Sequence, residues 1–305
     1  MTDGGLLVIG DVVTDVVARH GTALVHGTDT PARIHTLPGG AGANVACWAA
    51  RSGCSDVRLL ARVGADSADW HRDALRRAGV RCLLAVDDDV PTATVVALVD
   101  SAAERTFLTD SGAVLRLSPD DWSPSMLDGV AHLHLSGYLL FAATSRATAL
   151  LALREARRRG IPVSVDPASA GFLAELGVDR FLALVEGVDL LLPNSDEARL
   201  LTGLPEPADA AAKLSLHADR VVVTLGEGGA LLATAGAVTR RVPAVHVRGA
   251  VDSTGAGDAF TGGFLAAHLA GADDASATAA GCRAGAEAVT TVGGRPDPQD
   301  RAPGP

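Results

Sequence analysis

The feature that most constrains the fold is an alternation of short apolar runs with segments of helical periodicity. Each apolar run ends at small or polar residues, which is typical of buried parallel strands whose carboxyl ends open into loops. The alternation predicts an α/β protein, a three-layer α/β/α sandwich around a mostly parallel sheet. The expected strands span residues 6–9, 57–63, 131–135, 162–165, 188–192 and 221–225, and the expected helices span 66–78, 145–159, 195–202, 258–270 and 275–289.

Short, polar-interrupted extended pieces form a second pattern. They occupy residues 12–37, 80–86, 93–100 and 105–109, and we expect them to form a small, separate antiparallel sheet. No linker divides the chain into independent halves, so a single domain is expected over residues 1–305. The small sheet would be an appendage of that domain, with strands drawn from about 12–37 and 80–110.

The charge balance excludes several classes of protein. The chain has 26 Lys and Arg against 36 Asp and Glu residues, a net charge of −10, and Lys213 is its only lysine. A net acidic chain is not expected to have nucleic acid as a partner. Because no G-x-x-x-x-G-K-[ST] sequence and no early lysine exist, Walker-type and protein-kinase-type ATP sites are excluded.

No membrane span or export signal is expected. The longest uncharged stretch, around residues 130–145, is interrupted by two histidines, a serine and a glycine. No basic run precedes an apolar stretch at the N-terminus, and the four cysteines show no C-x-x-C pairing. We therefore expect a cytoplasmic protein without a membrane partner.

The segment from Val251 to Phe260, VDSTGAGDAF, is the most informative. Its two glycines precede an expected helix, and backbone N–H groups at a helix start are unpaired and carry partial positive charge. Such a turn would bind an anion without a lysine. Asp258 would lie in this positive region, where it could accept a proton from a hydroxyl group. The alternative is that Asp258 only caps the helix.

A second glycine-rich turn, LPGGAGANVA from Leu37 to Ala46, also precedes an expected helix. Asn44 can both donate and accept hydrogen bonds, which suits the hydroxyl groups of a sugar. Gly39 and Gly40 would allow backbone contact with such a ligand. The alternative is a plain strand-to-helix turn with an asparagine in the first helical turn.

Two further strand ends carry turns of the same kind. Asn194 and Glu197 lie three residues apart at an expected helix start, where they would form a capping box or offer oxygen ligands to Mg²⁺. The turn from Thr224 to Gly229 suits either a hairpin or contact with a nucleotide phosphate. All four motifs follow apparent strands, at the sheet edge where open α/β proteins bind ligands.

Together the motifs resemble those of the ribokinase/PfkB carbohydrate kinase family. Residues 39–44, GGAGAN, look like the family's N-terminal glycine signature, and residues 252–258, DSTGAGD, look like its C-terminal signature. Asn194–Glu197 is similar to the N-x-x-E motif, and Thr224–Gly226 is similar to the nucleotide-side turn. The resemblance spans residues 10–294 and implies a ribokinase-like fold in which the small sheet is the substrate lid.

The resemblance also implies roles for individual residues. Asp258 would be the general base, and the backbone amides of Gly255, Ala256 and Gly257 would form the anion hole for the γ-phosphoryl group of ATP. Substrate hydroxyls would be bound by Asp15, Gly40 and Asn44. The nucleotide would be contacted by Asn194, Thr224, Gly226, Gly229 and Gly293. Glu197 would act on Mg²⁺ through water, Asp252 and Thr254 would ligate K⁺, and the lid would form a homodimer contact.

Two positions depart from the ribokinases themselves. Ala41 replaces the usual lysine of the glycine signature, and Tyr138 stands near a position that is usually acidic. Both departures argue against ribose. The resemblance implies ATP-dependent phosphorylation of a primary alcohol (hydroxymethyl) group on a small sugar or sugar-like substrate. A phosphosugar acceptor is disfavoured because no Arg or Lys cluster accompanies the substrate motifs.

Two alternatives to a sugar kinase stay open. One is a nucleoside kinase, such as a pseudouridine kinase, because the differences at Ala41 and Tyr138 leave room for a base. The other is a catalytically inactive regulator that binds a sugar or nucleotide. A dinucleotide-dependent dehydrogenase is disfavoured because Gly10-Asp11-Val12 does not supply the G-x-G-x-x-G sequence after the first strand.

Overall fold

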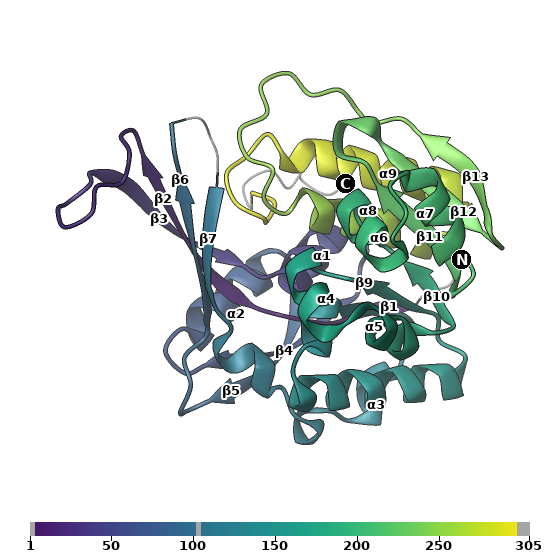
Figure 1. The fold of residues 1–305 in the computed structure, drawn as a ribbon. Coiled ribbons are helices and arrows are strands. Elements are labelled where there is room, and N and C mark those ends of the chain that lie inside the picture. The colour runs from purple at the N-terminus through teal and green to yellow at the C-terminus, as the bar shows by residue number, and fades with distance from the viewer. Residues whose placement is uncertain (1–3, 102–104, 298–305) are drawn as a thin grey trace, which may run out of the picture.

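A computed structural model describes residues 4–101 and 105–297, which form two sheets of unequal size (Figure 1). The large sheet has nine strands in the order β13-β12-β11-β10-β9-β8-β1-β4-β5. All neighbours from β11 to β5 are parallel, and β12 and β13 extend the sheet as an antiparallel edge. These strands are β1 (Gly5–Ile9), β4 (Val57–Gly64), β5 (Val80–Asp87), β8 (Val130–Ser136), β9 (Val163–Asp166), β10 (Val188–Leu191), β11 (Ala218–Thr224), β12 (Ala230–Thr234) and β13 (Ala237–Val242).

Helices cover both faces of the large sheet, which confirms the predicted α/β/α sandwich. Along β1, Leu7 and Ile9 pack in one core cluster with α3 and α5–α7, whereas Leu6 and Val8 pack in another with α1, α2, α8 and α9. A buried parallel strand needs apolar residues on both faces, and this explains its unbroken apolar sequence. The helices are α1 (Ala41–Arg51), α2 (Ala68–Arg77), α3 (Ala143–Arg159), α4 (Ala170–Leu176), α5 (Val178–Val185), α6 (Ser195–Thr202), α7 (Pro207–Leu214), α8 (Ala256–Leu269) and α9 (Asp274–Ala288).

The small sheet has four strands in the order β3-β2-β6-β7 and projects from the sandwich (Figure 1). Its strands are β2 (Val13–His20), β3 (Ala32–Gly39), β6 (Ala93–Val99) and β7 (Arg105–Asp110). The sheet is mixed and not wholly antiparallel as predicted, because β2 and β6 run parallel.

The assignment of residues 80–86 to the small sheet was wrong. This segment is β5, which pairs in parallel with β4 at the edge of the large sheet. It follows β4 and α2 as an ordinary β-α-β crossover. An edge strand is only half covered, so its polar-interrupted sequence is similar to that of the small-sheet strands. Residues 1–3, 102–104 and 298–305 of the predicted domain lie outside the described part of the chain.

Among the described residues, no helix combines the length and the apolar character that crossing a membrane requires.

Candidate active site

The two glycine signatures meet at a hydrogen bond between Asn44 and Asp258. Asn44 Nδ2 donates to Asp258 Oδ2 over 2.8 Å, although the residues are 214 positions apart in sequence. Asn44 is buried in the first turn of α1, and Asp258 lies in the first turn of α8. The structure therefore brings together the residue predicted to bind the acceptor and the residue predicted to be the base.

The N-terminus of α8 is left open by the residues around it. Its N-cap residue is Gly255, with φ of 72°, and no side chain caps the helix. The Ala256 amide donates to the Ser253 carbonyl over a long 3.3 Å, and a Cβ added to Gly257 would meet nothing within 4 Å. The hydrogen bond that Asp258 accepts comes from Asn44, so capping does not account for its position.

Glycines are required where the C-terminal loop crosses both signatures. A Cβ on Gly255 would lie 2.5 Å from the Gly294 Cα atom, and a Cβ on Gly294 would collide with the Asn44 amide. The Gly294 carbonyl accepts a hydrogen bond of 2.9 Å from Trp48 Nε1 on α1. The loop thus fixes the relative position of α1 and α8.

Carboxylates concentrate around this point, and burial shifts their pKa values upward. Burial raises the pKa of Asp258 well above its usual value, and the nearby charges of Asp166, Asp11 and Asp15 add to this effect. Burial likewise raises the pKa of Asp15 to about 6. Asp258 therefore holds a proton more strongly than a solvated carboxylate does.

Asn194 and Glu197 form the capping box that was one of their two predicted roles. Asn194 Oδ1 accepts from the amides of Asp196 and Glu197, each over 2.9 Å, and Glu197 Oε2 accepts from the Asn194 amide over 2.9 Å. Glu197 is buried, and burial together with the charge of Asp166 raises its pKa to about 8.

Asp166 is a site residue that the sequence reasoning missed. It ends β9, and burial raises its pKa to about 6. Asp166 raises the pKa of Glu197, and a divalent cation beside the two carboxylates would stabilise both charged forms. The signal was available in the sequence, since Asp166-Pro167 follows an expected strand as the other motifs do.

Asp252 anchors the turn before α8 through both of its carboxylate oxygen atoms. Its Oδ1 accepts from the Thr254 amide over 2.9 Å, and its Oδ2 accepts from the Gly293 amide over 3.1 Å. The described residues contain no group of three or more His, Cys, Asp or Glu side chains arranged to hold a metal ion. Asp252 and Gly293 thus connect the turn before α8 to the C-terminal loop.

Four of the five predicted nucleotide-side residues lie at the ends of two adjacent strands, β10 and β11, whereas Gly293 lies in the C-terminal loop. Asn194 and Thr224 form an isolated parallel bridge, and the Thr224 amide donates to the Pro193 carbonyl over 3.0 Å. Gly226 and Gly229 have positive φ values of 56° and 85°. A Cβ on Gly229 would collide with the Val242 carbonyl, so this glycine is required by the β11–β12 connection itself.

Tyr138 lies near the carboxylates of the site and belongs to a cluster of three aromatic rings. Tyr138 makes edge-to-face contacts with Phe141 and Phe172, whose rings stack with centroids 5.1 Å apart. The charges of Asp11, Asp258, Asp166 and Glu197 all add to the effect of burial in raising the Tyr138 pKa. Tyr138 therefore supplies a neutral phenol near these acids.

Asp11 is the second residue that the sequence reasoning missed. Its carboxylate accepts from the Ala41 amide over 2.7 Å and from the Gly42 amide over 3.1 Å. Its backbone carbonyl accepts from the Ala43 amide, and its Oδ1 also accepts from Ser136 Oγ over 2.8 Å. The N-terminus of α1 is therefore occupied by the chain's own carboxylate.

The third missed residue is Arg295, which lies beyond the second glycine pair. Its Nη2 donates to the Gly39 carbonyl over 2.8 Å, so it contacts the first glycine signature from the C-terminal loop. Its charge also lowers the pKa of Asp15, which opposes the effect of burial. The sequence shows no Arg or Lys cluster beside the substrate motifs, and the structure adds a single arginine, remote in sequence, that contacts the first of them.

Comparison with known proteins identifies the family. A model of the pfkB family carbohydrate kinases matches residues 4–301. A fructokinase from Klebsiella pneumoniae is 34% identical over 276 residues, which cover 87% of this chain and 84% of that protein. A 2-dehydro-3-deoxygluconokinase from Thermoproteus tenax is 31% identical over 74% of this chain and 72% of that protein.

Solved structures agree with this assignment. An aminoimidazole riboside kinase from Salmonella enterica, complexed with aminoimidazole riboside and an ATP analogue, has a TM-score of 0.76 and 29% identity over 97% of both chains. A ribokinase II candidate from E. coli, solved with ATP and Mg²⁺, has a TM-score of 0.83 and 25% identity over 95% of this chain and 94% of that one. The protein described here belongs to the PfkB family of carbohydrate kinases.

Proposed function

We propose that this kinase transfers the γ-phosphoryl group of ATP to a primary hydroxyl group of a small sugar, with Asp258 as the general base. The observation that carries the proposal is the Asn44–Asp258 hydrogen bond in front of an uncapped helix N-terminus. Phosphoryl transfer requires mainly positioning and charge stabilisation, and these groups supply both.

Asp258 is oriented for proton removal by its partner. Asn44 Nδ2 donates a hydrogen bond to Oδ2 of Asp258, which leaves Oδ1 of Asp258 to accept from the acceptor hydroxyl. As that proton moves to Asp258, the acceptor oxygen forms a bond to the γ-phosphorus and the bond to ADP breaks. The amides of Gly255, Ala256 and Gly257 then face the transferring group and stabilise its charge.

Asn44 is also suited to bind the acceptor directly. Its Oδ1 is buried and has no hydrogen-bond partner among the described residues. A buried acceptor atom without a partner costs free energy, and a substrate hydroxyl that donates to it would remove that cost. Asp15, whose carboxylate lies against Gly39, would accept from a further hydroxyl next to the backbone of Gly40.

Carboxylate and backbone oxygen atoms at the site would also hold the cations. When bound, Mg²⁺ would neutralise charge on the ATP phosphates, and Glu197 and Asp166 are the carboxylates that would hold it through water. Asn194, Thr224, Gly226, Gly229 and Gly293 would border the nucleotide. For K⁺, Asp252 and the backbone around Thr254 offer oxygen atoms beside the anion hole.

A nucleoside acceptor is the second candidate, and the aromatic cluster favours it. Tyr138 lies near the carboxylates in a cluster with Phe141 and Phe172, and such rings can stack on a base. A sugar ring also packs on aromatic faces, so the cluster does not exclude the first candidate.

The experiment is a measurement of ADP release with fructose, 2-dehydro-3-deoxygluconate, ribose, adenosine and pseudouridine as acceptors. We expect turnover with fructose or 2-dehydro-3-deoxygluconate. Turnover confined to adenosine or pseudouridine would replace the sugar by a nucleoside. Stabilisation by these compounds without any ADP release would instead indicate a binding regulator.

The small sheet is proposed as the substrate lid and as a homodimer contact. Ile34 on β3 and Phe107 and Leu108 on β7 are exposed apolar side chains. We expect light scattering to give the mass of a dimer, and Phe107→Asp to shift it to the mass of a monomer. A monomeric wild-type protein would contradict this part of the proposal.

A further inference from the structure

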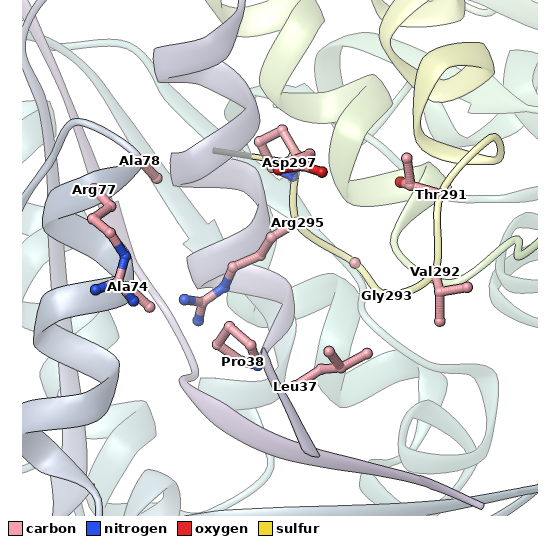
Figure 2. A pocket seen from close by; sticks show the side chains of 12 residues that line it. Leu37, Pro38, Ala74, Arg77, Ala78, Thr291, Val292, Gly293, Arg295 and Asp297 are labelled. Carbon is pink, nitrogen blue, oxygen red and sulfur yellow. The ribbon is translucent and has the colours of Figure 1, made fainter. Parts of the chain in front are cut away.

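A cavity that adjoins the proposed active site, and shares Gly293 and Gly294 with it, is lined by two arginines. It has a volume of about 380 Å³ and lies between the C-terminal end of α2, the end of β3 and the loop 291–297 (Figure 2). Arg77 reaches it from α2, and Arg295 reaches it from the loop. Pockets that bind small molecules fall in this range of volume, which begins at about 300 Å³.

The Arg295 guanidinium is incompletely satisfied. Only its Nη2 donates a hydrogen bond, to the Gly39 carbonyl over 2.8 Å, while Nε and Nη1 are buried without any partner among the described residues. Burial lowers the pKa of this guanidinium, and the neighbouring Cys47 and Asp15 groups oppose that effect. A buried cation with unpaired donors is costly unless a ligand supplies the missing charge and acceptors.

The residues around the cavity favour an anion. Arg77 is exposed, and neither it nor Arg295 takes part in an ion pair within the described parts of the chain. Asp297 is the only acidic residue in the lining, and most other lining residues are apolar or glycine. Two guanidinium groups with forked donors match the geometry of phosphate and carboxylate oxygens.

We propose that this cavity binds a small oxyanion, a phosphate ester or a carboxylate, between Arg295 and Arg77. The ligand would occupy a site behind the first glycine signature, separate from the anion hole at the start of α8. It would accept hydrogen bonds from Arg295 while Nη2 keeps its bond to the Gly39 carbonyl. This proposal does not depend on which acceptor the kinase phosphorylates.

The test is binding of inorganic phosphate to the full chain without ATP or acceptor, at constant ionic strength, by calorimetry and by the shift of the thermal unfolding midpoint. The variants are Arg77→Gln, Arg295→Gln and Arg295→Lys. The matched control is Arg76→Gln, which removes an exposed arginine of the same helix that does not line the cavity. Arg76 and Arg77 lie on α2 and not in the loop that packs against α8, so phosphate bound at α8 contributes equally to Arg77→Gln, Arg76→Gln and the wild type, and the difference among these three reports on the cavity.

We expect Arg295→Gln to weaken phosphate binding about tenfold, because a charge-assisted hydrogen bond is lost. Arg77→Gln should weaken it several-fold, Arg295→Lys should keep part of the affinity, and Arg76→Gln should bind as the wild type does. If Arg295→Gln does not fold, Arg77→Gln still tests the proposal, because Arg77 is exposed and its replacement leaves the core unchanged. Equal phosphate affinity in Arg77→Gln, Arg76→Gln and the wild type would overturn the proposal.

Discussion

The N-termini of α1 and α8 are similar in sequence, but a carboxylate of the chain binds the first amides of α1 and no side chain caps α8. Each helix follows a glycine-rich turn, and each has an N-cap glycine with positive φ, 98° at Gly40 and 72° at Gly255. At α1 the first amides donate to the Asp11 carboxylate. At α8 no side chain takes that place, and Asp258 is held to the side by Asn44.

The difference teaches how one kind of motif serves two purposes. A helix N-terminus attracts an anion because its amides are unpaired and its dipole is positive. When the chain supplies its own carboxylate, the result is a rigid support that holds Asn44 in place. When the chain leaves the amides free, the same geometry is available to a phosphoryl group.

The largest effect is a loss of activity expected at α8, whose N-terminus no side chain caps. Asp258→Asn keeps the hydrogen bond to Asn44 possible but removes the proton acceptor, so kcat for ADP release should fall about 10²–10⁴-fold while ATP binding and folding persist. Asp209→Asn is the matched control, because Asp209 has the same position in the first turn of α7 and is exposed. Retention of more than a tenth of wild-type kcat in Asp258→Asn would remove Asp258 from the mechanism.

The second largest effect is a loss of stability expected at α1, whose first amides donate to Asp11. Asp11→Ala leaves the amides of Ala41 and Gly42 without their acceptor in a buried place, so the free energy of unfolding should fall by ~2–4 kcal/mol. Urea unfolding measures this change. Asp273→Ala, at the exposed cap of α9, should cost only ~1 kcal/mol. An equal loss of unfolding free energy in the two variants would mean that burial of the α1 N-terminus does not increase the cost of removing its acceptor.

A pair of alanine substitutions tests the comparison directly. Gly42 and Gly257 are both the second residue of their helix, but a Cβ on Gly42 would lie 2.6 Å from the Gly10 Cα atom and a Cβ on Gly257 would meet nothing. Gly42→Ala should therefore destabilise the fold by ~1–3 kcal/mol. Gly257→Ala should unfold as the wild type does in urea, yet lose about tenfold in kcat because the methyl group displaces the phosphoryl group. A loss of stability in Gly257→Ala without one in Gly42→Ala would contradict the conclusion that the α1 N-terminus is occupied and the α8 N-terminus is open.

The smallest effect concerns α6, whose start is closed by its own capping box. The Glu197 pKa is raised from 4.5 to about 8, so the folded state binds this proton more tightly than the unfolded state does. This contribution to stability is present at low pH and is lost as pH rises from 4.5 through 8. Without Mg²⁺, Glu197→Gln should therefore gain stability relative to wild type from pH 5 to pH 8. A difference that is constant with pH, in unfolding curves of both proteins, would show that the Glu197 pKa is not raised.

The arrangement of the fold was largely accessible from sequence. The helix predicted over residues 195–202 coincides with α6, and the apolar runs at 57–63 and 188–192 lie within a residue of β4 and β10. These elements are specified by short-range periodicity and by flanking glycines or caps. Three short helices, α4, α5 and α7, were missed because seven or eight residues barely establish a helical period and, unlike the eight-residue α6, none of them begins at a side-chain cap.

The site was only partly accessible. Glycine turns and the order of the motifs indicated Asp258, Asn44 and Glu197. Asp11 and Arg295 were not found, because each acts through a residue that is distant in sequence, whereas Asp166 was overlooked although it follows an expected strand. Arg295, for example, donates to a carbonyl 256 positions away.

Sequence alone determined that two helices begin at glycine turns and that anion binding must occur without lysine. Those properties depend on backbone geometry and residue type, which neighbouring positions fix. Tertiary structure decided which of the two turns stays open, because an amide is occupied or free according to the group that packs against it. Asp11 closes one turn, 30 positions before its partner, and Asn44 draws Asp258 aside at the other, 214 positions away.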